Sequence, residues 1–151
     1  MVPIIGIDPG PTVSGVVVLH YERVKVSEVV ASDRVVQVVD ALMTTHRGAT
    51  VAIECLQCFG MAVGKETFET AYLIGRLMER FPSHVRVYRG DVKMHLCRSM
   101  RAKDANIRQA LLDLFGGAHA IGKKKNPGPL YGVRSHCWSA LAVAVTARDG
   151  S

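Results

Sequence analysis

The chain has 151 residues, 48% of them hydrophobic, which fits one domain, residues 1–151, with a sizeable core. It has no run of about eighteen apolar residues that would predict a membrane helix, no signal-peptide pattern and only four cysteines, so we expect a reducing, cytoplasmic setting. The net charge of +6 is concentrated in residues 86–134, where 11 Lys or Arg face 3 Asp or Glu, as in a polyanion-binding surface or a solvated charged face.

Three strands are predicted at the start of the chain. Residues 2–8 form a short apolar run, and residues 13–21 and 24–31 form two further runs. The turn Pro9-Gly10-Pro11 separates the first two strands, and only a hairpin turn fits between the second and the third. We therefore expect these strands to be antiparallel neighbours.

Helices and strands alternate in the rest of the sequence. Ser32-Asp33 is expected to cap a helix that runs to about His46, and Asp91 to cap a short helical piece. The other expected elements are strands over 51–54 and 85–88, helices over 65–81 and 104–115, a basic loop over 116–132 and a last helix from about Ser135. This order predicts an α/β fold: a mixed five-stranded sheet, three antiparallel strands followed by parallel strands, flanked by helices.

Two of the predicted parallel strands end on a carboxylate. Asp8 follows the apolar run of the first strand, and Glu54 follows Val51-Ala52-Ile53. Because the carboxyl ends of parallel strands meet at one edge of a sheet, we expect both side chains there. Buried carboxylates are costly unless something pairs with them, and a divalent cation could serve both. Asp8 alone could also be a turn residue that caps nearby N–H groups.

The last predicted helix offers a third polar group. It opens with Arg134-Ser135-His136-Cys137-Trp138-Ser139-Ala140, and helical spacing places His136 and Ser139 on a side with small residues. A side with small residues can approach a sheet closely. We therefore expect His136 near Asp8, although a lone histidine is more often a capping or core group.

These motifs resemble one known family. Gly6-Ile7-Asp8-Pro9-Gly10, then Ala52-Ile53-Glu54, then His136 before Ala140-Leu141-Ala142-Val143-Ala144 are similar to the RuvC-type Holliday junction resolvases of the ribonuclease H-like superfamily. The resemblance covers essentially the whole chain in order and spacing. The segments 103–111 and 138–145 look most like small phage and prophage members, which implies a bacterial or phage-infected cell.

The resemblance implies an endonuclease that resolves four-way DNA junctions by symmetric nicks, using Mg²⁺ or Mn²⁺. In the family, two carboxylates and groups on the last helix hold two metals, which implies Asp8, Glu54 and His136 as metal ligands and catalytic residues. Many members carry aspartate at the position of Ser139. Serine is a poor Mg²⁺ ligand, so either water fills this place or the second metal binds weakly. Imidazole suits Mn²⁺ better than Mg²⁺, so we expect higher activity with Mn²⁺.

The expected partner is branched DNA. Its expected phosphate contacts are Lys93, Arg98, Arg101, Lys103, Lys123, Lys124 and Lys125. Phe59, just past Glu54, could open the centre of a junction or could instead pack in the core. A junction has near two-fold symmetry, so a homodimer is expected, with the helix over 65–81 as the candidate interface or simply a cover for the sheet.

Other functions remain open from the sequence. The start of the chain also looks like the first phosphate loop of sugar kinases and actins, but one such domain cannot close over a nucleotide, and we expect no nucleotide cofactor and no membrane partner. A branched-DNA binder with little or no catalysis fits Ser139. A ribonuclease H-like nuclease with another substrate would share the metal site.

Overall fold

The computed structural model describes residues 1–150. Its centre is a five-stranded sheet in the order β3-β2-β1-β4-β5. The strands are β1 (Ile4–Asp8), β2 (Val13–His20), β3 (Arg23–Ala31), β4 (Thr50–Cys55) and β5 (Val85–Tyr88). Strands β1, β2 and β3 are antiparallel neighbours, whereas β1, β4 and β5 run parallel. The predicted mixed sheet is therefore confirmed.

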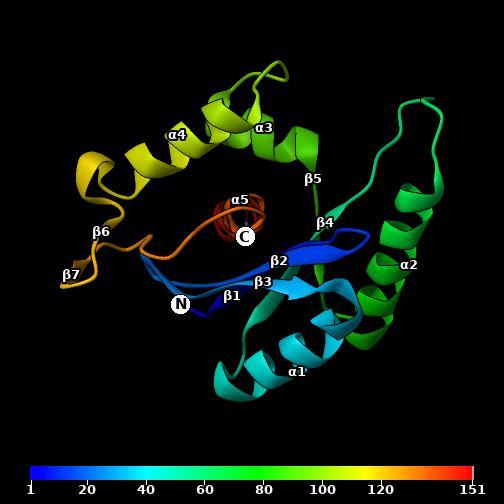
Figure 1. Ribbon diagram of the computed structural model, residues 1–151, viewed down its shortest axis with the longest axis horizontal. Coiled ribbons are helices and arrows are strands. Elements are labelled where there is room, and N and C mark those ends of the chain that lie inside the picture. The colour runs from blue at the N-terminus through cyan, green and yellow to red at the C-terminus, as the bar shows by residue number, and fades with distance from the viewer. Residues whose placement is uncertain (151) are drawn as a thin grey trace.

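Helices cover both faces of this sheet (Figure 1). One face carries α1 (Val35–Thr45) and α2 (Lys65–Arg80). The other carries α5 (Cys137–Asp149), and α3 (Arg89–Cys97) and α4 (Asp104–Leu114) lie outside α5. The last helix is thus enclosed between the sheet and two other helices. This explains why it is apolar all round rather than on one side.

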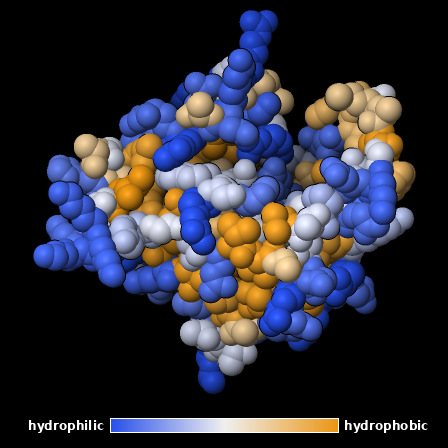
Figure 2. All heavy atoms as spheres, in the orientation of Figure 1, coloured by the Kyte–Doolittle hydropathy of each residue, from blue (hydrophilic) through white to orange (hydrophobic). Residues whose placement is uncertain are grey.

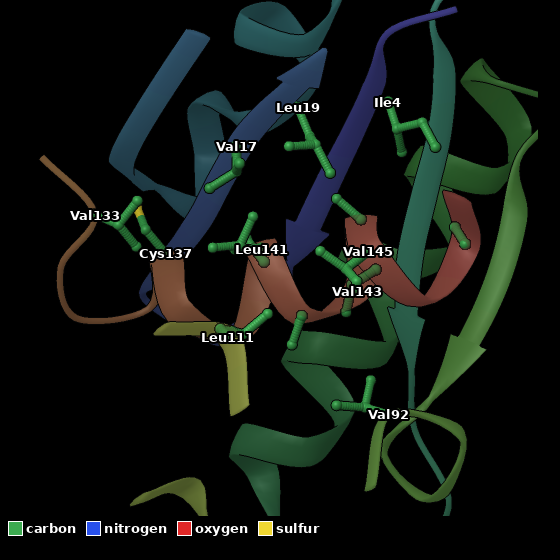
Figure 3. Close-up of a cluster of buried hydrophobic side chains, with 14 of the residues drawn as sticks. Ile4, Val17, Leu19, Val92, Leu111, Val133, Cys137, Leu141, Val143 and Val145 are labelled. Atoms are coloured by element: carbon green, nitrogen blue, oxygen red, sulfur yellow. The ribbon is translucent and has the colours of Figure 1, made fainter. Parts of the chain in front are cut away.

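Strand alternation divides the core into two clusters. Ile5, Ile7, Val51 and Ile53 point toward α1 and α2, whereas Ile4 and Ala52 point toward α5. On the α5 side, Val17 and Leu19 of the sheet belong to the same buried cluster as Leu141, Val143 and Val145 of the helix (Figure 3). By the same alternation, Asp8 and Glu54 extend the row of residues that faces α5.

Two glycines allow α5 to approach the sheet closely. A Cβ atom at Gly6 would lie 2.2 Å from the carbonyl oxygen of Ala140, and one at Gly15 would lie 2.4 Å from that of His136. Ala144 also lies close to Gly6. Small residues therefore line the contact on both sides, as the spacing in the last helix predicted, and they determine how near the start of α5 lies to β1 and β2.

Two local predictions were wrong, and the last helix begins two residues later than the predicted start near Ser135. Ser32 does not cap α1: residues Ser32–Arg34 form a 3₁₀ turn, and the Ser32 hydroxyl donates to the carbonyl oxygen of Gly10 instead. Residues 116–132 are not one loop, because they contain a 3₁₀ turn (Gly117–His119) and a short hairpin of β6 (Gly122–Lys123) and β7 (Asn126–Pro127). The last helix begins at Cys137, after Ser135 in the left-handed region (φ 52°).

Helix α2 buries one side against the sheet and leaves another side exposed. The buried residues are Thr70, Leu73, Ile74 and Leu77. The face with Phe68, Tyr72 and Gly75 remains on the surface, with Phe68 50% and Tyr72 63% exposed. The helix therefore covers the sheet with one side and presents a second apolar side to solvent.

The surface has apolar atoms gathered on one projecting arm. Figure 2 shows them where Figure 1 places the segment between β4 and α2. Leu56, Phe59, Met61 and Val63 of this segment are all exposed. Within residues 1–150, no helix has the length and apolar character needed to cross a membrane.

Candidate active site

The site is built on the ends of two neighbouring parallel strands. Asp8 is the last residue of β1 and Glu54 is the last but one of β4. The register pairs Ile7 with Ile53, so the next residue on each strand is the carboxylate. Both side chains face α5, because Gly6 and Ala52, two residues earlier, do so. The structure therefore brings Asp8 and Glu54 together as predicted.

Burial of this pair has a clear electrostatic consequence. The Oε2 atom of Glu54 is buried and has no hydrogen-bond partner within residues 1–150. Desolvation, together with the nearby charge of Asp8, raises the pKa of Glu54 to about 7. Desolvation also raises the pKa of Asp8, while His136 acts in the opposite direction. Two desolvated carboxylates with too few partners form a site that favours a cation.

His136 reaches this pair from the start of α5. Its Nδ1 atom lies 3.4 Å from Oδ2 of Asp8. The imidazole is 46% exposed and the Asp8 side chain 19% exposed, so the histidine occupies the solvent side of the site. The close approach at Gly15 fixes the backbone of His136 against β2. The predicted third residue therefore lies beside Asp8.

A ring of hydrogen bonds fixes the turn after Asp8. The Gly10 N–H donates to Oγ of Ser14, the Ser14 hydroxyl lies 2.8 Å from that of Ser32, and the Ser32 hydroxyl donates to the Gly10 carbonyl. Ser14 is fully buried. These hydrogen bonds connect β2, the 3₁₀ turn before α1 and the turn just after Asp8. They therefore restrain the backbone that carries the Asp8 carboxylate.

Sequence reasoning missed two charged residues at this site. Arg89, the first residue of α3, and Asp104, the first of α4, form an ion pair. Both act on the carboxylate pair: Arg89 lowers, and Asp104 raises, the pKa of Asp8 and of Glu54. The rule that identified Asp8 and Glu54 could have found Arg89, because it directly follows the parallel strand β5.

The donor set suits a divalent cation that prefers oxygen ligands. Asp8 and Glu54 supply carboxylate oxygens and His136 an imidazole nitrogen, and the buried Oε2 of Glu54 lacks a partner. Ser139 lies one turn into α5 and offers only a hydroxyl. Within the part of the chain that the structure describes, no cluster of three or more His, Cys, Asp or Glu has the arrangement of a preformed metal site. The types of ligand atom therefore suit a divalent cation, but the side chains are not already arranged around one position.

Several predicted DNA-contacting residues surround this end of the molecule. Lys103 directly precedes Asp104, and Arg101 follows Met100, whose side chain lies against Gly90 of α3. Lys93 lies one turn into α3, and Arg98 ends that helix in the left-handed conformation (φ 55°). Arg98, Arg101 and Lys103 are exposed and Lys93 is half-buried. Phe59 is 77% exposed, so packing in the core is excluded for it.

The lysine run lies elsewhere. Lys123, Lys124 and Lys125 belong to the β6–β7 hairpin and are all exposed. The segment after this hairpin is bonded to the turn between β2 and β3, with the Val24 N–H donating to the Pro129 carbonyl. That turn is at the opposite end of the sheet from Asp8, because Asp8 pairs with Gly15 and Ile4 with Leu19. These lysines are therefore remote from the carboxylates.

Comparison with solved structures identifies the fold. The chain superposes on Thermus thermophilus RuvC in complex with Holliday junction substrate with a TM-score of 0.72 and 22% identity, covering 99% of this chain and 97% of that one. It superposes on a second Thermus thermophilus RuvC structure with a TM-score of 0.70 and 24% identity, covering 98% and 96%. No protein-family model and no curated protein sequence matches the chain. The chain therefore has the RuvC fold over nearly its whole length.

Proposed function

We propose that this protein is a metal-dependent endonuclease that resolves four-way DNA junctions. The observation that carries the proposal is the pair of buried carboxylates, Asp8 and Glu54, with His136 against Asp8, on a fold shared end to end with RuvC. One of those RuvC structures is bound to a Holliday junction. Fold likeness alone would leave the chemistry open, and the carboxylate pair would supply the acidic centre that holds cations in metal-dependent phosphodiester hydrolysis.

In this proposal each residue has a separate task. Divalent cations held by Asp8, Glu54 and His136 would supply the electrophilic stabilisation of the phosphodiester and an activated water. Asp8 is central, because it lies between Glu54 on the neighbouring strand and His136 on α5. Glu54 would bind the cation as an ionised carboxylate and would orient a water molecule beside it. His136 completes the site from its solvent side.

A direct experiment tests the reaction and the substrate together. A labelled four-way junction and a linear duplex of matched sequence are incubated with the protein in Mg²⁺ and, separately, in Mn²⁺. We expect paired, symmetric nicks in the junction and none in the duplex. Cleavage of both substrates alike would contradict junction selectivity, and cleavage of an RNA–DNA hybrid alone would identify a ribonuclease H-like activity instead.

The apolar arm fits the open centre of a junction. Phe59 and Met61 lie at its tip, 77% and 75% exposed, directly after the strand that carries Glu54. An exposed aromatic ring can stack on an unpaired base, which duplex DNA does not offer. Phe59→Ala should therefore weaken junction binding and leave duplex binding unchanged. Val63→Ala, at the far end of the same arm, is the control for loss of exposed apolar surface.

Two copies of the chain are needed for symmetric nicks, and α2 offers a surface for pairing. Its exposed side lines a groove of about 730 Å³ together with Val36 of α1, and the groove contains Tyr72, Gly75, Arg76, Glu79 and Arg80. In a C2 dimer, an arginine of this groove in one copy would face Glu79 of the other copy. Light scattering should give the mass of a dimer, and Tyr72→Asp should give a monomer that nicks one strand at a time.

A second candidate function is a junction-binding protein without nuclease activity. Ser139 favours it, because the α5 side of the site carries no carboxylate. This alternative predicts tight junction binding and no nicks with any divalent cation.

A further inference from the structure

A cavity of about 310 Å³ lies beside the carboxylate pair. It is a half-open hollow between the first turns of α3 and α4 and the start of α5, and its polar lining consists of Arg89, Asp104, Arg108, Ser135, Trp138 and Ser139. Ser135 and Ser139 flank His136, which contacts Asp8. The start of the last helix therefore contributes residues to both the cavity and the site, and none of the tasks assigned above uses the charged residues of the cavity.

Arg89 is the group that connects this cavity with the carboxylates. It lies two residues beyond Val87, which pairs with Glu54 in the register of β4 and β5, so it starts at the same edge of the sheet as Glu54. Its charge acts on both Asp8 and Glu54. Its side chain is 30% exposed, which leaves it accessible from the cavity. A guanidinium has several N–H donors, and within residues 1–150 its hydrogen bond is to Asp104.

Asp104 holds this guanidinium from the solvent side. The Asp104 side chain is 90% exposed, so its ion pair with Arg89 adds little to the free energy of unfolding. Its effect is geometric, because it restricts a long and flexible side chain to the mouth of the cavity. On the α5 side of the cavity, Ser139 carries no charge. The guanidinium of Arg108 makes a cation–π contact with Trp138, 4.8 Å from the centre of the ring. Arg89 is thus not neutralised from α5.

We propose that this cavity is a phosphate-binding subsite, in which Arg89 donates to a non-bridging oxygen of a DNA phosphate at or next to the cleaved bond. Asp104 is a positioning residue that orients the guanidinium. The reason is electrostatic: a phosphodiester that approaches two carboxylates is repelled, and a planar guanidinium matches two phosphate oxygens where a lysine ammonium does not. The inference rests on the proposed function, because the substrate is taken to be DNA.

The first test measures binding and needs no cleavage. Junction affinity is measured in Ca²⁺ for wild type, Arg89→Lys and the control Arg86→Lys, an exposed arginine on β5. Each protein is given junctions with a neutral methylphosphonate at one phosphate near the exchange point. At one position, we expect the modification to lower the junction affinity of wild type and of Arg86→Lys by about tenfold, as for loss of one charge-assisted hydrogen bond. At that position the affinity of Arg89→Lys should hardly change. Equal effects in all three proteins at every position would overturn the subsite.

The second test separates the subsite from mere stabilisation of the fold. Single-turnover cleavage at saturating junction should fall about tenfold or more in Arg89→Lys and less in Asp104→Asn, with unchanged thermal midpoints. In Arg89→Ala, added guanidinium ion should restore part of the rate, whereas NaCl of equal ionic strength should not. Wild-type rates in Arg89→Lys would refute the role of Arg89. Absence of cleavage by wild type would refute the proposed nuclease instead, and the binding cycle would still decide the subsite.

Discussion

Nδ1 of His136 lies 3.4 Å from Oδ2 of Asp8, although the two residues come from opposite ends of the chain. The contact exists because α5 runs directly over β1 and β2, where Gly6 and Gly15 leave room for its backbone. The candidate active site is therefore a property of the packing between the first strands and the last helix.

Asp8→Asn should abolish cleavage and preserve junction binding. The substitution keeps the shape of the side chain and removes the charge that lies between Glu54 and His136. Loss of a carboxylate charge from a metal site costs several kcal/mol of transition-state stabilisation. Single-turnover rates should fall at least about a thousandfold. Affinity for the junction in Ca²⁺ should change less than about threefold. Asp113→Asn on α4 is the control, and a cleaving Asp8→Asn protein would move the site elsewhere.

Mn²⁺ should support faster cleavage than Mg²⁺. His136 offers nitrogen, which Mn²⁺ accepts more readily than Mg²⁺ does, and Ser139 offers no carboxylate to compensate. The measurement is the cleavage rate against cation concentration up to saturation. His136→Asp should reduce or reverse the preference, because it replaces nitrogen with oxygen. Equal or higher rates with saturating Mg²⁺ in the wild type would contradict the role given to His136.

Glu54 should make the cation-free protein less stable as the pH rises. Its pKa is about 7 in the folded protein and about 4.5 when exposed, so the folded state binds more protons between these values. The free energy of unfolding therefore falls as the pH rises from about 4.5 to 7, by up to about 3 kcal/mol. In EDTA, Glu54→Gln should be more stable than wild type at pH 8 and similar to it at pH 5.

The control for this effect is Glu28→Gln, an exposed glutamate on β3. Its thermal midpoint should follow that of wild type at both values of pH. Adding a divalent cation at pH 8 should raise the midpoint of wild type more than that of Glu54→Gln, since the cation replaces the proton. A Glu54→Gln protein that is less stable than wild type at pH 8 would show that the carboxylate has a structural partner.

Gly6→Ala should damage both the fold and the site. The added Cβ would lie 2.2 Å from the Ala140 carbonyl oxygen and 2.9 Å from the Ala144 Cβ, so α5 must move away from β1. Overpacking of this kind costs about 1–3 kcal/mol, or roughly 3–10 °C in the thermal midpoint. Gly64→Ser, where a Cβ meets nothing within 4 Å, should leave the midpoint nearly unchanged. Equal midpoints for both variants would refute the close approach.

The lysines of the β6–β7 hairpin should increase the affinity for the junction without changing the cleavage rate at saturation. Lys123, Lys124 and Lys125 lie at the far end of the sheet from Asp8, where they can hold a DNA arm but cannot reach a cleaved phosphate. Replacing all three with Gln should reduce the slope of log affinity against log salt by about 2–3, with single-turnover rates at saturation unchanged. The variant Arg47→Gln, just after α1, controls for general loss of charge. An unchanged slope would exclude this surface.

The parts of the site that could be predicted are those fixed by short-range pattern. An apolar run that ends on a carboxylate identifies a strand end, and the alternation of helices and strands makes β1 and β4 parallel, so Asp8 and Glu54 share an edge of the sheet. The small residues of the last helix likewise indicated its close approach to the sheet. These inferences need only periodicity, turn residues and the handedness of crossovers.

What could not be predicted depends on how separate elements meet. The ion pair between Arg89 and Asp104 joins the starts of two helices, and neither residue has a local pattern that names the other. Helix α2 has two apolar sides, and only packing decided that Leu73 and Leu77 are buried while Phe68 and Tyr72 are exposed. The remote position of the lysine hairpin follows from its attachment to the β2–β3 turn.

The sequence by itself thus determined the α/β fold and the three residues at the centre of the candidate site, because strand ends and helix starts are local features. The tertiary structure alone decided the distance and exposure of His136 beside Asp8, the cavity nearby and the guanidinium of Arg89 that lines it. The physical reason is that burial and charge act through space. The raised pKa of Glu54 and the exposed pair of Arg89 with Asp104 arise from neighbours that are distant along the chain.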